Sequence, residues 1–138
     1  MSEGPTHSFE EHTGEVLLKV TSPTLPKLFE EAGRGLAELM AEQWIDDPAA
    51  SPELAVVRAS DRDALLFEWL NELLFRSETR GRVYPYLQVT ALTDSELQAK
   101  IRGALPSAPR TAVKAATYHR LQIVQRPEGY TATIVLDV

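Results

Sequence analysis

The stretch Ser60–Gly81, SDRDALLFEWLNELLFRSETRG, has the features of one long amphipathic helix. Ser60 is expected to cap the first turn with Asp63 reaching back towards it, and Gly81 favours the left-handed conformation that ends a helix. Asn71 falls on the polar side. At about 100° per residue, the large apolar side chains share one arc of roughly half the circumference; they are Leu65, Leu66, Trp69, Leu70, Leu73 and Leu74. We therefore predict a helix that is buried on one face against a sheet.

A second helix is predicted earlier in the chain, from Leu25 to about Glu42. Thr24 is the expected N-cap, and Pro26 falls in the first turn, where a missing N–H is tolerated. Gly33 and Gly35 would each destabilise this helix by about 1 kcal/mol relative to alanine. Their expected role is therefore close packing against the sheet or the other helix.

Most other segments alternate between apolar and polar residues, the pattern typical of β-strands. Strands are expected at residues 8–11, 16–20, 53–59, 83–92, 97–102, 112–125 and 130–138. Residues 103–110 contain two prolines and are expected to form a loop. These elements predict an α+β fold in two layers, with a mainly antiparallel β-sheet and two amphipathic helices packed on one face. A single domain over residues 1–138 is expected, with residues 1–6 flexible.

Composition narrows the classes of function. The 138 residues contain no cysteine, which excludes disulfides and thiolate chemistry. The N-terminus lacks a signal-peptide pattern, and no apolar run approaches the roughly 18 residues of a membrane span, so we expect a cytoplasmic protein without membrane contact. A net charge of -6 argues against independent binding to an RNA backbone. An acidic protein can still dock on a basic enzyme, because complementary charge speeds encounter.

The last two residues offer a candidate metal site. A strand that runs to Val138 places the Asp137 carboxylate beside the terminal α-carboxylate, and two such anions repel each other without a counter-charge. A divalent cation that prefers oxygen ligands would supply that charge, particularly if Glu15 came from a neighbouring strand. The alternative is a solvated, frayed chain end.

Three more residues are candidates for function or for contact with a partner. The imidazoles of His12 and His119 are candidates for a functional contact. The alternative for each is a structural role, as a polar residue whose hydrogen bonds are satisfied at a strand end. Lys114 is either an exposed strand lysine or a positive group near the carboxylates or near a nucleotide phosphate. Because the sequence contains no Gly-rich phosphate loop and no nucleophile elbow, we assign no catalytic residue.

Four segments of the chain, in order and spacing, resemble the archease family. Residues 12–16, HTGEV, are similar to the family's His-Thr-Ala-Asp motif, and EWLNELL after the strand-like VVRASDRDALL resembles its central segment. Residues 113–119, VKAATYH, resemble its Lys-Ala-x-Thr-Tyr-His segment, and residues 136–138, LDV, resemble its ending. The resemblance covers essentially the whole chain.

This resemblance implies a protein cofactor, not an enzyme. Its partner would be an RtcB-type RNA ligase, which joins RNA ends bearing a 2′,3′-cyclic phosphate or 3′-phosphate to a 5′-hydroxyl in tRNA splicing or RNA repair. Family members promote guanylylation of the ligase and so support multiple turnover. This role implies contact with RNA only indirectly, through the ligase. The alternatives are a free-standing chaperone-like or scaffold protein with an exposed sheet edge, and a small metal-dependent hydrolase.

The resemblance also implies a ligand set for the metal. Glu15, Asp137 and Val138 occupy the positions that bind metal in the family, with calcium expected first and magnesium or manganese as alternatives. Glu15 departs from the family's aspartate by one methylene group, which moves the carboxylate outward by about one bond. This change would allow bidentate coordination, alter the metal preference or weaken the site.

Overall fold

The stretch around Trp69 forms helix α2, Arg62–Arg80, in the computed structural model, which describes residues 4–138. Its apolar arc is buried as predicted, and the indole Nε1 of Trp69 donates a hydrogen bond to the Phe29 carbonyl over 2.9 Å. Gly81 ends the helix in the left-handed conformation, with φ of 64°. The prediction that Ser60 caps the helix is wrong. Because the first helical residue is Arg62, the capping position falls on Asp61, whose carboxylate accepts from Ala64 N over 2.8 Å.

Helix α1, Leu25–Met40, follows Thr24 at the N-cap position. Its two glycines lie where neighbouring side chains leave little room. A Cβ on Gly33 would lie 2.5 Å from Leu87 Cδ1, and one on Gly35 would lie 2.8 Å from Leu18 Cδ1. Close packing is therefore the role of both glycines, as predicted. The helix ends slightly earlier than predicted, because the chain continues directly into a strand.

The strands form two sheets. In sheet A the spatial order is β1 (Thr6–His12), β2 (Glu15–Ser22), β8 (Gly129–Asp137) and β7 (Ala115–Arg126). In sheet B, β6 (Glu96–Pro109) pairs with β3 (Ala41–Asp46), β4 (Glu53–Arg58) and β5 (Val83–Leu92). Every strand pair recorded within residues 4–138 is antiparallel.

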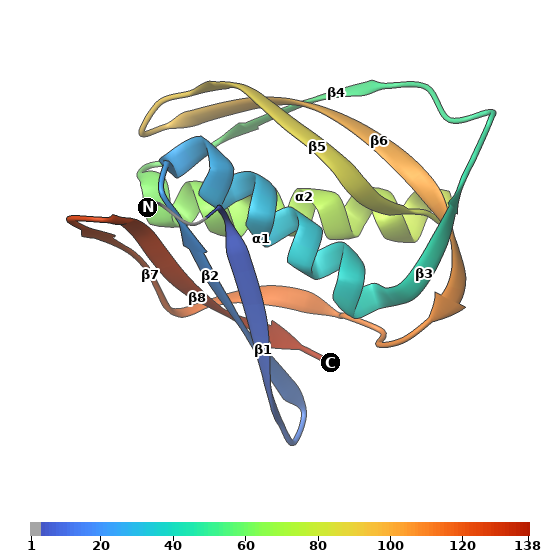
Figure 1. Ribbon diagram of the computed structural model, residues 1–138, viewed down its shortest axis with the longest axis horizontal. Helices are drawn as coiled ribbons and strands as arrows, with labels where there is room; N and C mark the ends of the chain where they lie inside the picture. Colours follow the sequence, from blue (N-terminus) through green and yellow to red (C-terminus); the bar gives the residue numbers. More distant parts are fainter. Residues whose placement is uncertain (1–3) are drawn as a thin grey trace.

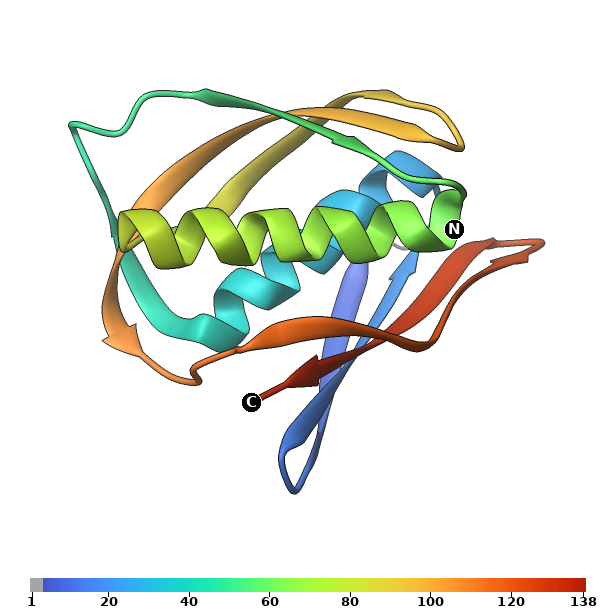
Figure 2. The same cartoon turned by 180° about the vertical axis from the view of Figure 1, so that it is seen from behind.

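The two helices lie between the two sheets, as Figure 1 shows and as Figure 2 shows from behind. Helix α1 contacts β1, β2 and β8 of sheet A and β3 and β5 of sheet B, whereas α2 contacts β7 on one side and β4, β5 and β6 on the other. The predicted α+β class, with antiparallel strands and two amphipathic helices, is confirmed. One sheet was expected, whereas the structure has two, with the helices between them. The strands divide because β3, β4 and β5 all pair with β6, while β8 lies between β2 and β7.

The expectation of a loop over residues 103–110 is wrong for all but Arg110, because residues 103–109 form the second half of β6. Both prolines lie opposite residues of β3, Pro106 across from Trp44 and Pro109 across from Ala41. Register shifts on either side of Gln43 accommodate this pairing. Proline lacks an N–H and is tolerated in a strand where the ladder is irregular. The two prolines therefore made the local sequence look like a loop although the segment is a strand.

Little can be said of the expected flexible segment over residues 1–6. Residues 1–3 lie outside the described part of the chain, and Thr6 already belongs to β1. Within residues 4–138, neither helix combines the length and the apolar character needed to cross a membrane.

Candidate functional site

The acidic residues near the two ends of the chain meet at one corner of sheet A. Glu15 at the start of β2 and Asp137 at the end of β8 are directly opposite across the antiparallel ladder. Residues in such a pair project from the same face of the sheet. The backbone on either side is also tied down, because Val138 N donates to the Gly14 carbonyl over 3.1 Å and Lys114 N donates to the Asp137 carbonyl over 2.8 Å. The corner thus joins three segments that are distant in the sequence.

Val138 is held in place from two directions. Its backbone N–H is bonded to Gly14 in the turn between β1 and β2, and its half-buried side chain packs against the main hydrophobic core. A terminal residue with a packed side chain and a paired N–H is less free to fray than a solvated one. Val138 is therefore fixed beside the β1–β2 turn that precedes Glu15.

A cavity of about 650 Å³ opens on the outer face of sheet A beside this corner. His12, Glu15 and His119, which are far apart in the sequence, all line it. Its other lining residues are Leu17, Arg120, Thr133 and Val135. Three of the residues selected from the sequence are thus brought together around one cavity, with Asp137 across the ladder from Glu15.

His119 reaches this cavity because β7 bulges. Thr117 lies opposite Val135, but the next recorded partner is Gln122, opposite Thr133. Residues 118–121 of β7 therefore lie beside the single position 134 of β8. Within the bulge Arg120 has a φ of 58°, in the left-handed region that a non-glycine residue seldom adopts. Bulges bend a strand and redirect its side chains, which explains how residues 119 and 120 come to line the cavity.

Polar side chains from α2 fix β7 on both sides of the bulge. Before it, Asn71 Nδ2 donates to the Ala116 carbonyl over 3.2 Å, and Ala116 N donates to Asn71 Oδ1 over 3.0 Å. After it, Ile123 N donates to Asp63 Oδ1 over 2.8 Å. Asp63 was expected to reach back to the helix cap, and that prediction is wrong, because its carboxylate pairs with β7 instead. The polar face of α2 therefore acts as a partner for the open edge of β7.

Tyr118 attaches the bulge to the first turns of α2. Its ring meets that of Phe67 edge to face, with the ring centroids 5.3 Å apart. Partial burial, together with the charges of Asp61 and Asp63, raises the pKa of the Tyr118 phenol. This residue stays neutral and stacks at physiological pH, so its contribution is to position the bulge.

Thr117 leaves a polar group unsatisfied next to the bulge. Its Oγ1 is buried and has no hydrogen-bond partner among the described residues, the one side-chain atom of which this is recorded. A buried hydroxyl without a partner costs free energy comparable to that of a lost hydrogen bond. The Val135 side chain opposite lines the cavity. Thr117 itself does not line the cavity, so its hydroxyl is a buried unsatisfied group beside the site.

Charges on the outer face balance only in part. Lys19 Nζ lies 2.7 Å from Glu10, and His12 Nε2 lies 3.4 Å from the same carboxylate. The hydrogen bond and positive charge of Lys19 hold the pKa of Glu10 below its usual value. Glu10 is thus engaged by two neighbours, whereas Glu15 and Asp137 have no ion pair within the described chain.

Lys114 lies apart from the two histidines. Its residue lines a different cavity, of about 470 Å³, with Met40, Leu74, Ser77, Glu78, Ala112 and Val113 near the ends of the helices. Only its backbone reaches the acidic corner, through the bond to Asp137. Its exposed side chain makes no recorded ion pair within residues 4–138.

The donor set at the corner consists of oxygen atoms. Within the described residues, no group of three or more His, Cys, Asp or Glu side chains is arranged to hold a metal ion. Glu15 and Asp137 supply two side-chain carboxylates, and the α-carboxylate of Val138 is the third group of the predicted set. Carboxylates of this kind suit hard divalent cations such as calcium and magnesium. The residues therefore fit such an ion chemically.

Sequence reasoning missed Arg120 as a member of the site. Nothing in the local pattern ATYHRLQ signals a bulge, since its residues also read as an uninterrupted strand. The bulge arises from how β7 pairs with β8 and from the two contacts with α2. Only the tertiary arrangement places Arg120 over the cavity.

The fold is that of a small α+β protein whose two helices lie between two antiparallel sheets and whose polar site is a corner of one sheet. Solved structures with this fold include protein 1598 of Methanobacterium thermoautotrophicum, with a TM-score of 0.74 and 23% identity over 96% of this chain and 98% of that one. Another is a Thermotoga maritima protein described as "an archease, possible chaperone", with a TM-score of 0.63 and 17% identity over 94% of both chains.

Sequence comparison gives the family. The model of the Archease protein family matches residues 7–138, so this chain belongs to the archease family. It is 31% identical over 136 residues to Protein archease of Thermococcus kodakarensis, covering 93% of this chain and 95% of the relative. It is 27% identical over 149 residues to Protein archease of Methanosarcina mazei, covering 99% of both. The predicted resemblance is confirmed.

Proposed function

We propose that this protein is an accessory factor of an RtcB-type RNA ligase. It promotes guanylylation of the ligase, and so multiple turnover in tRNA splicing or RNA repair, and it performs neither reaction itself. Membership of the archease family supports this proposal. The observation that carries it is the pairing of Glu15 with Asp137 at a corner that also holds the last residue of the chain. In this proposal RNA is reached through the ligase, and the cytoplasmic location stays a prediction.

The corner has properties that suit contact with another enzyme's active site. Its carboxylates lie beside two imidazoles and the Arg120 guanidinium, groups that donate to or accept from phosphate and protein groups alike. The bulge and the turn after His12 hold these groups at the surface of a rigid sheet. We propose that His12, His119 and Arg120 contact the ligase or its nucleotide, and that Lys114 contacts the ligase from the adjoining cavity.

Glu15, Asp137 and Val138 are proposed to hold a divalent cation, with calcium expected first and magnesium or manganese as alternatives. Each residue would contribute carboxylate oxygen, the ligand type that these ions prefer. The bound cation would supply positive charge where the chain has only acids, and phosphate oxygens could share it. Because Glu15 is longer than the family's aspartate by one methylene group, it reaches further from β2, which would alter the metal preference or the strength of binding.

A single-turnover guanylylation assay tests the proposed function. A partner ligase, GTP and metal are mixed with and without this protein, and formation of guanylylated ligase is followed in time. We expect a faster reaction with the wild-type protein and a much smaller effect with Asp137→Asn. Asp94→Asn is the matched control, because Asp94 is 88% exposed in the turn between β5 and β6. Equal rates with and without the protein, or a covalent guanylate on this chain itself, would overturn the proposal.

A chaperone-like function is the second candidate, favoured by the description of the Thermotoga maritima relative as a possible chaperone. Exposed apolar side chains such as Leu54 and Ile45, which are 62% and 57% exposed, would contact unfolded clients. Suppression of client aggregation by the isolated protein, measured by light scattering, would favour this function. Hydrolytic turnover by the isolated protein would instead favour a metal-dependent hydrolase.

A further inference from the structure

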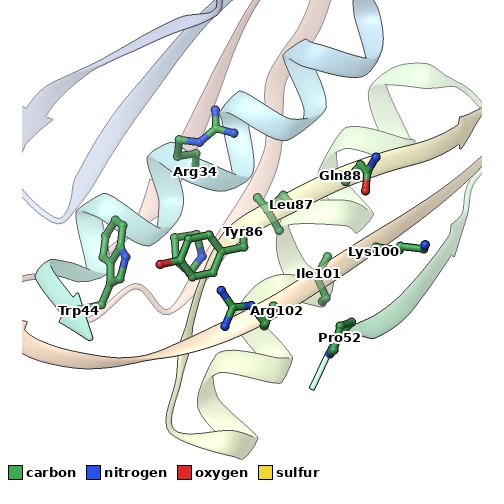
Figure 3. Close-up of a pocket in the computed structure, with 10 residues that line it drawn as sticks. Arg34, Trp44, Pro52, Tyr86, Leu87, Gln88, Lys100, Ile101 and Arg102 are labelled. Atoms are coloured by element: carbon green, nitrogen blue, oxygen red, sulfur yellow. The ribbon is translucent and has the colours of Figure 1, made fainter. Parts of the chain in front are cut away.

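A second cavity, of about 590 Å³, lies against sheet B and α1, whereas the acidic corner belongs to sheet A. Arg34 of α1, Trp44 of β3, Tyr86 of β5, and Lys100 and Arg102 of β6 line it. Figure 3 shows the side chains of Arg34, Trp44, Tyr86 and Arg102 around one opening. Two aromatic rings and three cations from four elements therefore share one groove.

The charge of this groove differs from that of the chain as a whole. The protein carries a net charge of -6, and most of its arginines are paired with carboxylates, as Arg82 is with Asp47 over 2.6 Å. Within residues 4–138, neither Lys100 nor Arg102 has a recorded ion pair. Arg34 is partly neutralised by Glu31, 2.5 Å away. Lys100 and Arg102 are thus cations of the groove without a recorded ion pair in the described chain, and the Asp46 carboxylate beside Tyr86 offsets part of their charge.

Its aromatic residues are arranged for stacking. The Arg102 guanidinium lies over the Tyr86 ring, 4.5 Å from its centroid, and the Tyr86 hydroxyl donates to Asp46 over 2.6 Å. Stacking engages the π-face of a guanidinium, so its N–H groups remain able to donate in the plane. The hydrogen bond to Asp46 fixes the orientation of Tyr86. Trp44 contributes a second ring, which is half-buried at the same opening.

We infer that this groove binds a nucleoside phosphate, with the base against Trp44 and the phosphate beside Lys100 and Arg102. Every base has a π-face that stacks on aromatic side chains, and arginine binds phosphate through paired N–H donors. The volume suits one small ligand. A long RNA backbone is disfavoured by the net charge, because only a few phosphates would meet a cation. The ligand is therefore a single nucleotide unit, either free or at the end of a strand.

The two tryptophans of the chain make it possible to detect ligand binding at the groove selectively. Trp44 lines the groove, whereas Trp69 is 0% exposed in the core. Isotope-labelled protein is titrated with adenosine 5′-monophosphate, and the two indole N–H resonances are followed by NMR. We expect a saturable shift of the Trp44 resonance while that of Trp69 stays still. Adenosine lacks the phosphate and ribose 5-phosphate lacks the base. Each should bind at least about tenfold more weakly than adenosine 5′-monophosphate.

Variants locate the site. Lys100→Gln and Arg102→Gln should each weaken binding of adenosine 5′-monophosphate by about tenfold, whereas Arg126→Gln, an equal charge change at the end of β7, should have no effect. The amide spectrum shows directly whether each variant is folded. A 5′-phosphorylated RNA hexamer that binds tighter than the mononucleotide would identify a strand end as the source, and equal affinity would identify the free nucleotide.

Three results would overturn the inference. They are the absence of a selective Trp44 shift, unchanged affinity in both groove variants, and equally tight binding of a hexaglutamate peptide, which would indicate an acidic protein segment instead. All measurements use this protein alone. A negative result in these binding assays would therefore not contradict the proposed activation of a ligase. A negative guanylylation assay would likewise not contradict nucleotide binding in the groove.

Discussion

The side-chain amide of Asn71 pairs with the backbone of Ala116 as a neighbouring strand would, with Nδ2 donating to the carbonyl over 3.2 Å and Oδ1 accepting from the N–H over 3.0 Å. Ala116 is buried, so neither backbone group has ready access to water in compensation. Asn71 thus connects the long helix to the strand that carries His119. A residue on the polar side of the helix supports the candidate site from behind.

Replacing Asn71 by alanine should destabilise the fold by about 1–3 kcal/mol, because two buried backbone groups lose their partner. The bulge after Ala116 should also loosen, so activation of the ligase should fall by more than the loss of folded protein explains. Urea unfolding and the guanylylation assay measure the two effects. Glu68→Ala, on the exposed face of α2, is the control. A free-energy change below about 0.5 kcal/mol for Asn71→Ala would contradict this role.

Trp69→Ala should cost about 3–5 kcal/mol, because it removes a large buried ring and the hydrogen bond that its indole donates to the Phe29 carbonyl. Phe75→Ala is the matched truncation on the same helix, where the ring is 61% exposed, and it should change stability by no more than about 0.5 kcal/mol. Denaturant melts of both variants check the contrast. A loss below about 1 kcal/mol for Trp69→Ala would show that this face is not core.

At the acidic corner, Asp137→Asn and an extension beyond Val138 should both weaken binding of divalent metal, because each removes one anionic carboxylate from the proposed ligand set. Without metal the fold should stay intact or gain stability, since repulsion between like charges is relieved. Calorimetric titration with calcium, magnesium and manganese measures the affinity. Glu15→Asp should preserve or strengthen binding. Unchanged affinity in the first two variants would rule out these ligands.

Thr117→Val should leave stability unchanged or raise it by up to about 1 kcal/mol, because it replaces an unpartnered buried hydroxyl with a methyl group of similar shape. Thr117→Ser keeps the hydroxyl and serves as the comparison. If the hydroxyl donates to a bound partner, ligase activation falls in the valine variant and persists in the serine variant. A clear loss of stability in Thr117→Val would indicate a hydrogen bond within the folded chain.

Asp47 should contribute to stability at neutral pH and lose that contribution in acid. Hydrogen bonds from Ala49 N and from Arg82 hold its pKa below the ordinary value of 3.8. A carboxyl group whose pKa is lowered on folding stabilises the protein above its unfolded pKa, and the effect disappears as the pH falls through the folded pKa. Asp47→Asn should therefore be less stable than wild type at pH 7, and the difference should shrink below about pH 3.8. Urea melts at pH 7 and at a pH below 3.8, with the exposed Asp94→Asn as control, test this. The same difference in stability at both pH values would contradict it.

Local sequence was sufficient where short-range physics decides the structure. The apolar arc around Trp69 and the left-handed Gly81 determined α2, and period-two alternation determined most strands. Family motifs pointed to Glu15 and Asp137, which the structure places opposite each other across one strand ladder. Their role as metal ligands stays a prediction. The capping residue was misassigned by one position, because serine and aspartate cap equally well and sequence alone does not select between neighbours.

Tertiary structure decided what depends on partners distant in the sequence. Residues 103–109 become strand because β3 is there to pair with them, in spite of two prolines. Asp63 turns from the helix cap to Ile123 because β7 offers an unpaired N–H. Arg120 joins His12 and His119 because the register of β7 slips against β8. A chain's own residues set its local preferences, but hydrogen-bond partners supplied by other segments determine register, and register determines which side chains meet.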